Sequence, residues 1–178
     1  MSCEVKDKLI WISNSIGMYT VKSMCGLLSS PPQYATQWLK LNVDGSSTGE
    51  PGNAGIGGVL RVHKGVVQCM YRSIPVGIKD SNEAELIAVI RALELSSTRE
   101  ECTGKRIIVE SDSTNVINRM IKESNRPWKF YVLFILASRF SSGLRLVKYS
   151  NILREGNSMT DALTKQGFTR NYELMTWF

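Results

Sequence analysis

The first half of the sequence alternates hydrophobic and polar residues in the way that β-strands do. The alternation is clearest at residues 38–44, W-L-K-L-N-V-D, which lead into a glycine-rich segment that we expect to form a loop. Two further apolar, β-branched runs, at residues 56–62 and 66–73, are separated by H-K-G, which indicates an antiparallel hairpin. The sequence therefore predicts three consecutive strands.

The hydrophobic period changes to that of a helix at residues 80–95, D-S-N-E-A-E-L-I-A-V-I-R-A-L-E-L. The opening of this segment, with Asp80 three residues before Glu83, resembles a capping box. The pattern then predicts a strand at 106–110, helices at 113–121 and 127–140, a strand at 144–149 and a helix at about 157–166. This order, βββαβααβα, is typical of an α/β protein with a mixed sheet in three layers.

Residues 1–32 differ from the rest of the chain. Their pattern resembles a small hairpin followed by a short helix, and the segment S-S-P-P at its end is typical of a linker. We therefore expect an N-terminal appendage and linker at 1–32, a single domain at 33–170 and a C-terminal tail at 171–178.

Composition narrows the class of protein. The 178 residues suit one domain with an appendage, and the net charge of +6 is compatible with a polyanionic partner such as nucleic acid. Four widely spaced cysteines without a C-x-x-C pair, and a single histidine, argue against a zinc site. Neither a membrane-spanning run nor a signal-peptide pattern is present, so we expect an intracellular protein.

Three acidic residues at the ends of predicted elements have ordinary structural explanations. Asp44 precedes a glycine, as in many turns. Asp112 follows a strand and would serve as a helix N-cap. Asp161 falls near the first turn of the last helix, where a negative charge suits the helix dipole.

Glu85 is harder to explain by structure alone. On a helix of 3.6 residues per turn it shares a stripe with Ala88, Val89 and Ala92, whereas Glu83 lies on a more polar face. A carboxylate at the boundary of a core needs a compensating partner. If all four carboxylates meet at one edge of the sheet, their mutual repulsion favours a hard divalent cation that prefers oxygen ligands.

Four segments also carry a family resemblance, and they extend from about residue 40 to residue 167. They are L-N-V-D-G-S-S-T-G-E-P-G-N-A-G-I-G-G-V-L-R, D-S-N-E-A-E-L-I-A-V-I-R-A-L-E-L, I-V-E-S-D-S and R-E-G-N-S-M-T-D-A-L-T-K. The chain resembles type 1 ribonuclease H domains, most closely the reverse-transcriptase-like domains of plant non-LTR retrotransposons. The resemblance implies a ribonuclease H-like α/β fold with a mixed five-stranded sheet whose first three strands are antiparallel.

The resemblance also implies a site and a substrate. Two Mg²⁺ ions, for which Mn²⁺ can substitute, would be held by the four catalytic carboxylates Asp44, Glu85, Asp112 and Asp161. Asn82 matches an asparagine near the minor groove of the substrate, and Gly45 and Ser46 match the turn that approaches the RNA strand. The implied partner is an RNA/DNA hybrid, and we expect no membrane association and no obligate protein partner.

The resulting hypothesis is an endonuclease that hydrolyses the RNA strand of RNA/DNA hybrids by a two-metal mechanism in which Asp44 bridges the metals. Contacts to the 2′-hydroxyl group would select RNA. The basic residues near Trp128 either line a channel for the second strand or form a solvated face: Arg119, Lys122, Arg126 and Lys129.

Two departures from the family pattern leave an alternative open. Asn151 stands where family members usually have a histidine, and asparagine cannot transfer a proton at neutral pH. Leu153 stands where proline is common, and residues 8–23 resemble a reverse transcriptase tail without the cysteine- and histidine-containing module. The alternative is a catalytically weak or inactive nucleic-acid-binding remnant. The D-G-S and N-x-x-E motifs argue against a third class, another nuclease or integrase of this fold.

Overall fold

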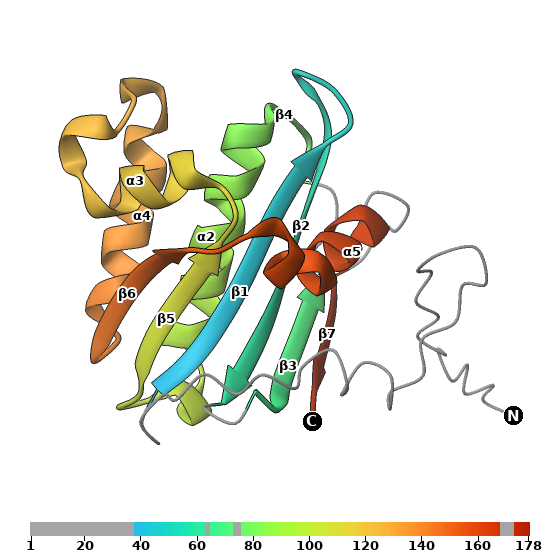
Figure 1. Ribbon diagram of the computed structural model, residues 1–178. Coiled ribbons are helices and arrows are strands. Elements are labelled where there is room, and N and C mark those ends of the chain that lie inside the picture. The colour runs from blue at the N-terminus through green and yellow to red at the C-terminus, as the bar shows by residue number, and fades with distance from the viewer. Residues whose placement is uncertain (1–37, 63–64, 73–75, 168–172) are drawn as a thin grey trace, which may run out of the picture.

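The computed structural model describes residues 38–62, 65–72, 76–167 and 173–178. The predictions for residues 1–32 lie outside the described residues. Within the described part, strands come first and are followed by a mixture of helices and strands, and the strands build a single sheet with helices on both faces (Figure 1).

The sheet has the strand order β6-β5-β1-β2-β3-β7. β1 pairs in parallel with β5, and β5 with β6, whereas β1-β2, β2-β3 and β3-β7 are antiparallel. A two-residue strand, β4, pairs with the start of β2. The strands are β1 (Trp38–Ser47), β2 (Gly52–Val62), β3 (Val67–Arg72), β4 (Ile78–Lys79), β5 (Arg106–Ser111), β6 (Leu146–Asn151) and β7 (Leu174–Trp177).

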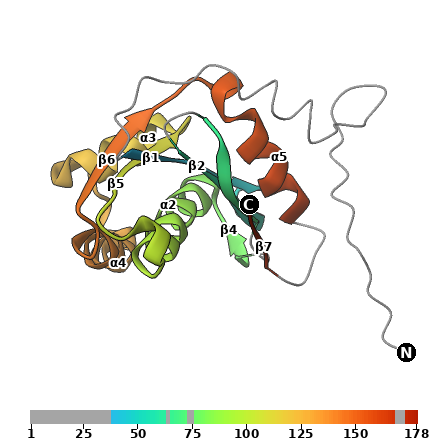
Figure 2. The same ribbon diagram turned by 90° about the horizontal axis from the view of Figure 1, so that it is seen from below.

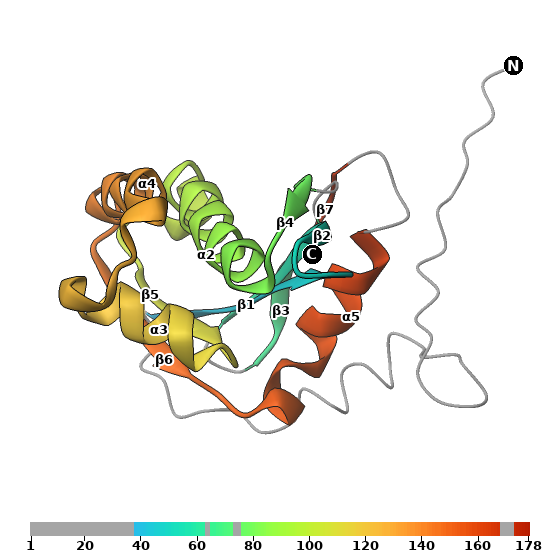
Figure 3. The same ribbon diagram turned by 90° about the horizontal axis from the view of Figure 1, so that it is seen from above.

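The helices form the outer two layers. The views turned by 90° from Figure 1, from below and from above, show α2 and α4 on one face of the sheet and α5 on the other (Figures 2 and 3). The α-helices are α2 (Ser81–Ser97), α3 (Thr114–Ile121), α4 (Tyr131–Ser142) and α5 (Ser158–Gly167). Short 3₁₀ helices are η1 (Glu100–Cys102), η2 (Glu123–Asn125), η3 (Trp128–Phe130) and η4 (Arg154–Asn157).

The alternation in β1 places its side chains in two different layers. Leu39, Leu41 and Val43 are buried in the main core with the apolar residues of α2, α3 and α4. The even-numbered residues point to the opposite face, because successive side chains of a strand alternate. On that face, α5 packs through Leu163 against a smaller apolar cluster of β2 and β3.

The predicted class, layers and element order are confirmed, and the strand count is corrected from five to seven. β4 has two residues and β7 has four, so neither is long enough to show a period-two pattern. β7 occupies part of the segment expected to be a C-terminal tail. It covers the edge of β3, and its Met175 and Trp177 pack against the main core.

A second correction concerns the glycine-rich segment after residue 44. It is not a loop: β1 continues to Ser47 and pairs with β2 up to the register Ser47↔Ala54. The turn occupies only residues 48–51, where the amide of Thr48 donates to the carbonyl of Asn53 at 2.9 Å. Asp44 therefore lies inside a paired strand rather than at its end.

Gly45 allows the close approach of α2 to β1. A Cβ atom at this position would lie 2.3 Å from the carbonyl carbon and oxygen of Ala84, and 2.4 Å from the amide nitrogen of Glu85. Real Cβ atoms do not approach backbone this closely, so any side chain at residue 45 would push the helix away. The glycine thus sets the distance between two of the acidic residues.

We predict that Gly45→Ala destabilises the fold by about 1–3 kcal/mol or more, the usual cost of overpacking a rigid interior. Urea unfolding followed by circular dichroism measures this loss. Gly143→Ala is the control, because the nearest atom to its Cβ would be 3.5 Å away and its φ of −78° suits alanine. Equal midpoints for the two variants would contradict the role assigned to Gly45.

Candidate metal centre

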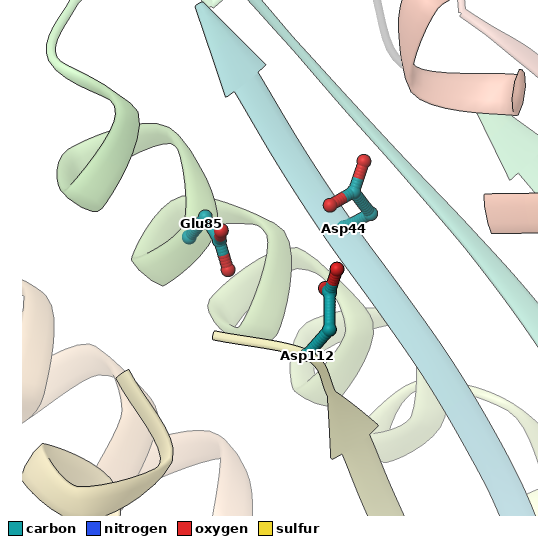
Figure 4. Close-up of side chains that lie close together, drawn as sticks. All are labelled: Asp44, Glu85 and Asp112. Atoms are coloured by element: carbon teal, nitrogen blue, oxygen red, sulfur yellow. The ribbon is translucent and has the colours of Figure 1, made fainter. Parts of the chain in front are cut away.

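Three carboxylates from three different elements meet beside β1. Asp44 lies in β1, Glu85 in the second turn of α2 and Asp112 directly after β5 (Figure 4). Each offers one oxygen atom, and these three oxygens lie within 4.8 Å of one another. This distance is short enough for one cation to contact all three after small side-chain rotations.

Strand register accounts for the meeting of the two aspartates. β1 and β5 are parallel neighbours, with Asn42 opposite Glu110. Asp44 and Asp112 each come two residues later, and side chains two residues apart share a face of the sheet. The third carboxylate arrives because Gly45 admits the backbone of α2 at Ala84–Glu85.

Asp44 is the most enclosed of the three. It is 6% exposed, and its Oδ2 atom has no hydrogen-bond partner. Burial, followed by the charges of Asp112 and Asp161, raises its pKa to about 6, although Thr164 and Lys165 act in the opposite direction. A buried carboxylate oxygen without a donor is costly unless a cation satisfies it.

The pKa of Glu85 is raised further than that of Asp44. Burial, followed by the charge of Asp44, raises its pKa to about 8, against the effect of hydrogen bonds from Ser113 and Ser111. The Ser111 hydroxyl donates to Glu85 Oε2 at 3.2 Å, and it accepts a bond from the Ser113 amide at 3.1 Å. Without a bound cation, Glu85 therefore carries a proton at neutral pH.

Asp112 is held from two sides. Asn157 Nδ2 donates to its Oδ1 at 3.0 Å. Arg154 Nε lies 3.9 Å from its Oδ2, a long ion pair made by a side chain that is 81% exposed. Asn157 therefore contacts one oxygen of this carboxylate and Arg154 lies near the other.

Asp161, the fourth predicted carboxylate, stands apart from the other three. Its Oδ2 pairs with Lys165 Nζ at 2.7 Å, one turn further along α5. It nevertheless lies close enough to raise the pKa of Asp44. Asp161 also falls on the same helix stripe as Asn157 and Thr164, and both of these bond to β1.

The donor set fits a divalent cation of the Mg²⁺ type. All three groups are carboxylates, the ligand chemistry that Mg²⁺ and Mn²⁺ prefer. Arg154 makes a long ion pair with Asp112 of the group, and Lys165 pairs with Asp161, outside the group. Three buried or half-buried carboxylates with so little compensation need a positive charge.

The predicted substrate-binding residues lie on the same two elements as Asp44 and Glu85. Gly45 and Ser46 lie in β1, opposite Ile56 and Gly55, rather than in a turn. Asn82 is in the first turn of α2, and its Oδ1 accepts a bond from Asn115 Nδ2 of α3 at 3.5 Å. The first turns of α2 and α3 thus meet through two amide side chains, one three residues before Glu85 and the other three residues after Asp112.

Among the residues near Trp128, Arg126 and Lys129 bond to other parts of the chain, whereas Trp128 itself is exposed. Arg126 donates to the carbonyls of Arg119 and Met120 and lies over the ring of Phe134, so it fastens α3 to α4. Lys129 pairs with Asp80 at 3.0 Å. Trp128 is 82% exposed and stacks on Tyr131 with ring centroids 5.1 Å apart.

Asn151, at the position of the usual family histidine, has a backbone role. Its Nδ2 donates to the carbonyl of Ser111 at 3.0 Å, and the amide of Ile152 donates to the same oxygen. The residue therefore closes the end of β5 next to Asp112. Leu153, which replaces a common proline, is 79% exposed.

Several residues that contact the carboxylates were not identified from the sequence: Ser111, Ser113, Asn157 and Thr164. Ser111 has no pattern of its own beyond its position before Asp112. The sequence predicts Asn157 only as the start of the last helix. A signal for it does exist, because it precedes Asp161 by four residues and therefore lies on the same helix face.

The mixed sheet, with its parallel β1-β5-β6 half, its α2 and α5 layers and the carboxylates on β1, on α2 and directly after β5, defines a ribonuclease H-like protein. Solved structures agree. The chain is similar to ribonuclease H1 of Halobacterium salinarum, with a TM-score of 0.66, 24% identity and coverage of 73% of this chain and 96% of that one. It is also similar to LC11-RNase H1 isolated from compost, with a TM-score of 0.67, 26% identity and coverage of 74% and 96%. LC11-RNase H1 has also been solved in complex with an RNA/DNA hybrid.

Sequence comparison gives the family. The profile of the family described as reverse transcriptase-like matches residues 42–167. A relative from Arabidopsis thaliana, named as a candidate ribonuclease H protein, is 32% identical over 135 residues. These cover 74% of this chain, but the chain spans only 21% of that relative's length. The chain belongs to the reverse transcriptase-like family, whose domains have the ribonuclease H fold.

The raised pKa values predict how stability depends on pH when no metal is present. The native state binds more protons than the unfolded state between about pH 4.5 and pH 8, because the pKa of Glu85 is about 8 and that of Asp44 is about 6. The free energy of unfolding should therefore fall as the pH rises through this range. Thermal unfolding in EDTA at pH 5, 6, 7 and 8 measures it, and Glu85→Gln should flatten the decline above pH 6.

Addition of Mg²⁺ should reverse this trend, since a cation replaces the protons and binds better when they are gone. The increase in Tm caused by Mg²⁺ should be larger at pH 8 than at pH 6. A melting temperature in EDTA that does not change between pH 5 and pH 8 would contradict the coupling of the three carboxylates.

Proposed function

We propose that this chain is a divalent-metal-dependent endonuclease that hydrolyses the RNA strand of RNA/DNA hybrids. The observation that carries the proposal is the group formed by Asp44, Glu85 and Asp112, three carboxylate oxygens within 4.8 Å on a ribonuclease H-like fold. The ribonuclease H name of the Arabidopsis relative and the hybrid bound by LC11-RNase H1 support it.

Magnesium ions held by these carboxylates would supply an activated water molecule and stabilise the leaving oxygen of the phosphodiester. The protein's own contribution is to hold the carboxylates in place. Gly45 sets the spacing of Glu85 from β1, and Ser111 and Asn157 orient Glu85 and Asp112. Asp161, on the neighbouring helix, is a candidate fourth ligand after release of Lys165.

Recognition of the hybrid is proposed for the polar groups around this site. Asn82 and Ser46 lie on the elements that carry Glu85 and Asp44, and they offer donors and acceptors for a 2′-hydroxyl group. The exposed Trp128 offers a surface on which a sugar or base of the second strand can stack.

In the described part of the chain, no helix has the length and apolar character that a membrane crossing requires.

The alternative, a binding remnant with weak or no cleavage, is favoured by one observation. Asn151 is committed to the carbonyl of Ser111 and has no titratable proton. The endonuclease and the binding remnant would differ in the rate of RNA cleavage, and both would bind the hybrid.

Purified protein incubated with a labelled RNA/DNA hybrid and Mg²⁺ is predicted to cleave the RNA strand and to leave single-stranded RNA and duplex DNA of the same sequence intact. Asp112→Asn should reduce cleavage to background, because it removes one carboxylate while keeping the side-chain shape. Loss of cleavage in this variant would also exclude a contaminating nuclease as the source of the activity. Hybrid binding without cleavage by wild-type protein would refute the enzyme and leave the binding remnant.

A gain of function is predicted for Asn151→His. An imidazole beside Asp112 titrates near pH 6.5 and can transfer a proton, which asparagine cannot. We expect a higher kcat between pH 6 and pH 8, with Asn151→Gln as the control that changes size without adding a titratable group. Equal kcat values for the histidine and glutamine variants would show that proton transfer at this position does not limit turnover.

A further inference from the structure

Asn157 connects three parts of the site through one nitrogen atom. Its Nδ2 donates to the carbonyl of Val43 at 3.0 Å and to Asp112 Oδ1 at 3.0 Å. Val43 directly precedes Asp44, and Asn157 is the last residue of η4, immediately before α5. The side chain thus joins β1, the end of β5 and the start of the helix that carries Asp161.

The burial of Asn157 shows that this arrangement is selective for an amide. The residue is 1% exposed, and its Oδ1 is buried without a hydrogen-bond partner among the described residues. A buried carbonyl left unpaired lowers stability, so packing alone does not favour asparagine here. Only a group with two N–H donors on one atom satisfies two acceptors at once, since a hydroxyl donates once and a carboxylate does not donate.

The hydrogen bond from Asn157 orients the carboxylate of Asp112. This bond, made to Oδ1, restricts rotation of the Asp112 carboxylate. Figure 4 shows this carboxylate next to those of Asp44 and Glu85. Thr164, two turns further along α5, donates to the carbonyl of Asp44 at 3.2 Å. Asp161 lies between these two anchors on the same helix stripe, so α5 cannot slide along β1 without breaking both bonds.

We infer that Asn157 is a positioning residue that holds Asp112 and the start of α5 in register for divalent-cation binding. The inference rests on the proposed function for its role in turnover, but its first consequence is cation affinity. Outer partners of metal ligands typically change affinity by about 10–100-fold when they are removed.

The chain contains a matched control in Asn42. This residue is also 1% exposed, its Nδ2 donates to a carboxylate, Glu110 Oε2, at 2.9 Å, and its Oδ1 is also buried without a partner. Glu110 does not belong to the carboxylate group. Substitutions at 42 and 157 therefore both remove an amide-to-carboxylate hydrogen bond, one outside the site and one inside it, and those at 157 also remove the bond to Val43.

The experiment measures Mn²⁺ affinity by isothermal titration, with Mn²⁺ as the probe. Asn157→Ser, which keeps one donor, should weaken binding about tenfold, and Asn157→Leu, which keeps none, should weaken it toward 100-fold. Asn42→Ser and Asn42→Leu should lower Tm comparably but keep the Kd for Mn²⁺ within about twofold of wild type. If one variant at 157 fails to fold, the other decides.

Several outcomes separate this inference from the proposed function. Variants at 157 that bind Mn²⁺ like wild type would overturn the positioning role even if wild-type protein cleaves hybrid. A wild-type protein that binds Mn²⁺ but does not cleave would refute the proposed function, while the contrast between 157 and 42 still decides the inference. A wild-type protein that binds no Mn²⁺ would overturn both. For an active enzyme, kcat should fall in Asn157→Ser with KM for hybrid unchanged.

Discussion

Repulsion among three carboxylates is the constraint on which the rest of this structure depends. Their oxygens lie within 4.8 Å in a largely water-excluded place, and burial and mutual charge raise the pKa of Glu85 to about 8 and of Asp44 to about 6. A fold that tolerates this arrangement must hold each group rigidly, since any freedom would let the charges move apart. The sheet, the α2 contact and the α5 anchors supply that rigidity.

The three supports act in different ways. The parallel pairing of β1 with β5 brings Asp44 and Asp112 to the same height through backbone hydrogen bonds alone. The approach of Glu85 depends on the missing side chain of Gly45. The orientation of Asp112 depends on a side-chain amide, that of Asn157. The site therefore combines the register of two paired strands, the lack of a side chain at Gly45 and a hydrogen bond donated by Asn157.

The sequence predicted the parts of this structure that have a period. The alternation in residues 38–44 and the helical stripe of α2 located the core and favoured Glu85 over Glu83, and the structure places Glu85 in the carboxylate group. It did not predict β4 or β7, because strands of two and four residues owe their existence to the partner they pair with. The continuation of β1 through Gly45 was missed for a related reason, since glycine indicates a turn unless the neighbouring helix is known.

For the fourth carboxylate, the match to a sequence motif did not predict the contacts that the side chain makes in the folded structure. Asp161 matched the family motif, but in this structure it bonds Lys165 and lies outside the group of three. Its helix is nevertheless tied to β1 at Val43 and at Asp44, through Asn157 and Thr164. The side chain on the stripe between those anchors has few directions in which to move, and an exposed ion pair one turn away is a weak competitor. The ion pair with Lys165 therefore compensates the charge of Asp161 without fixing its position, and the position of Asp161 follows from the amide and the hydroxyl on either side of it.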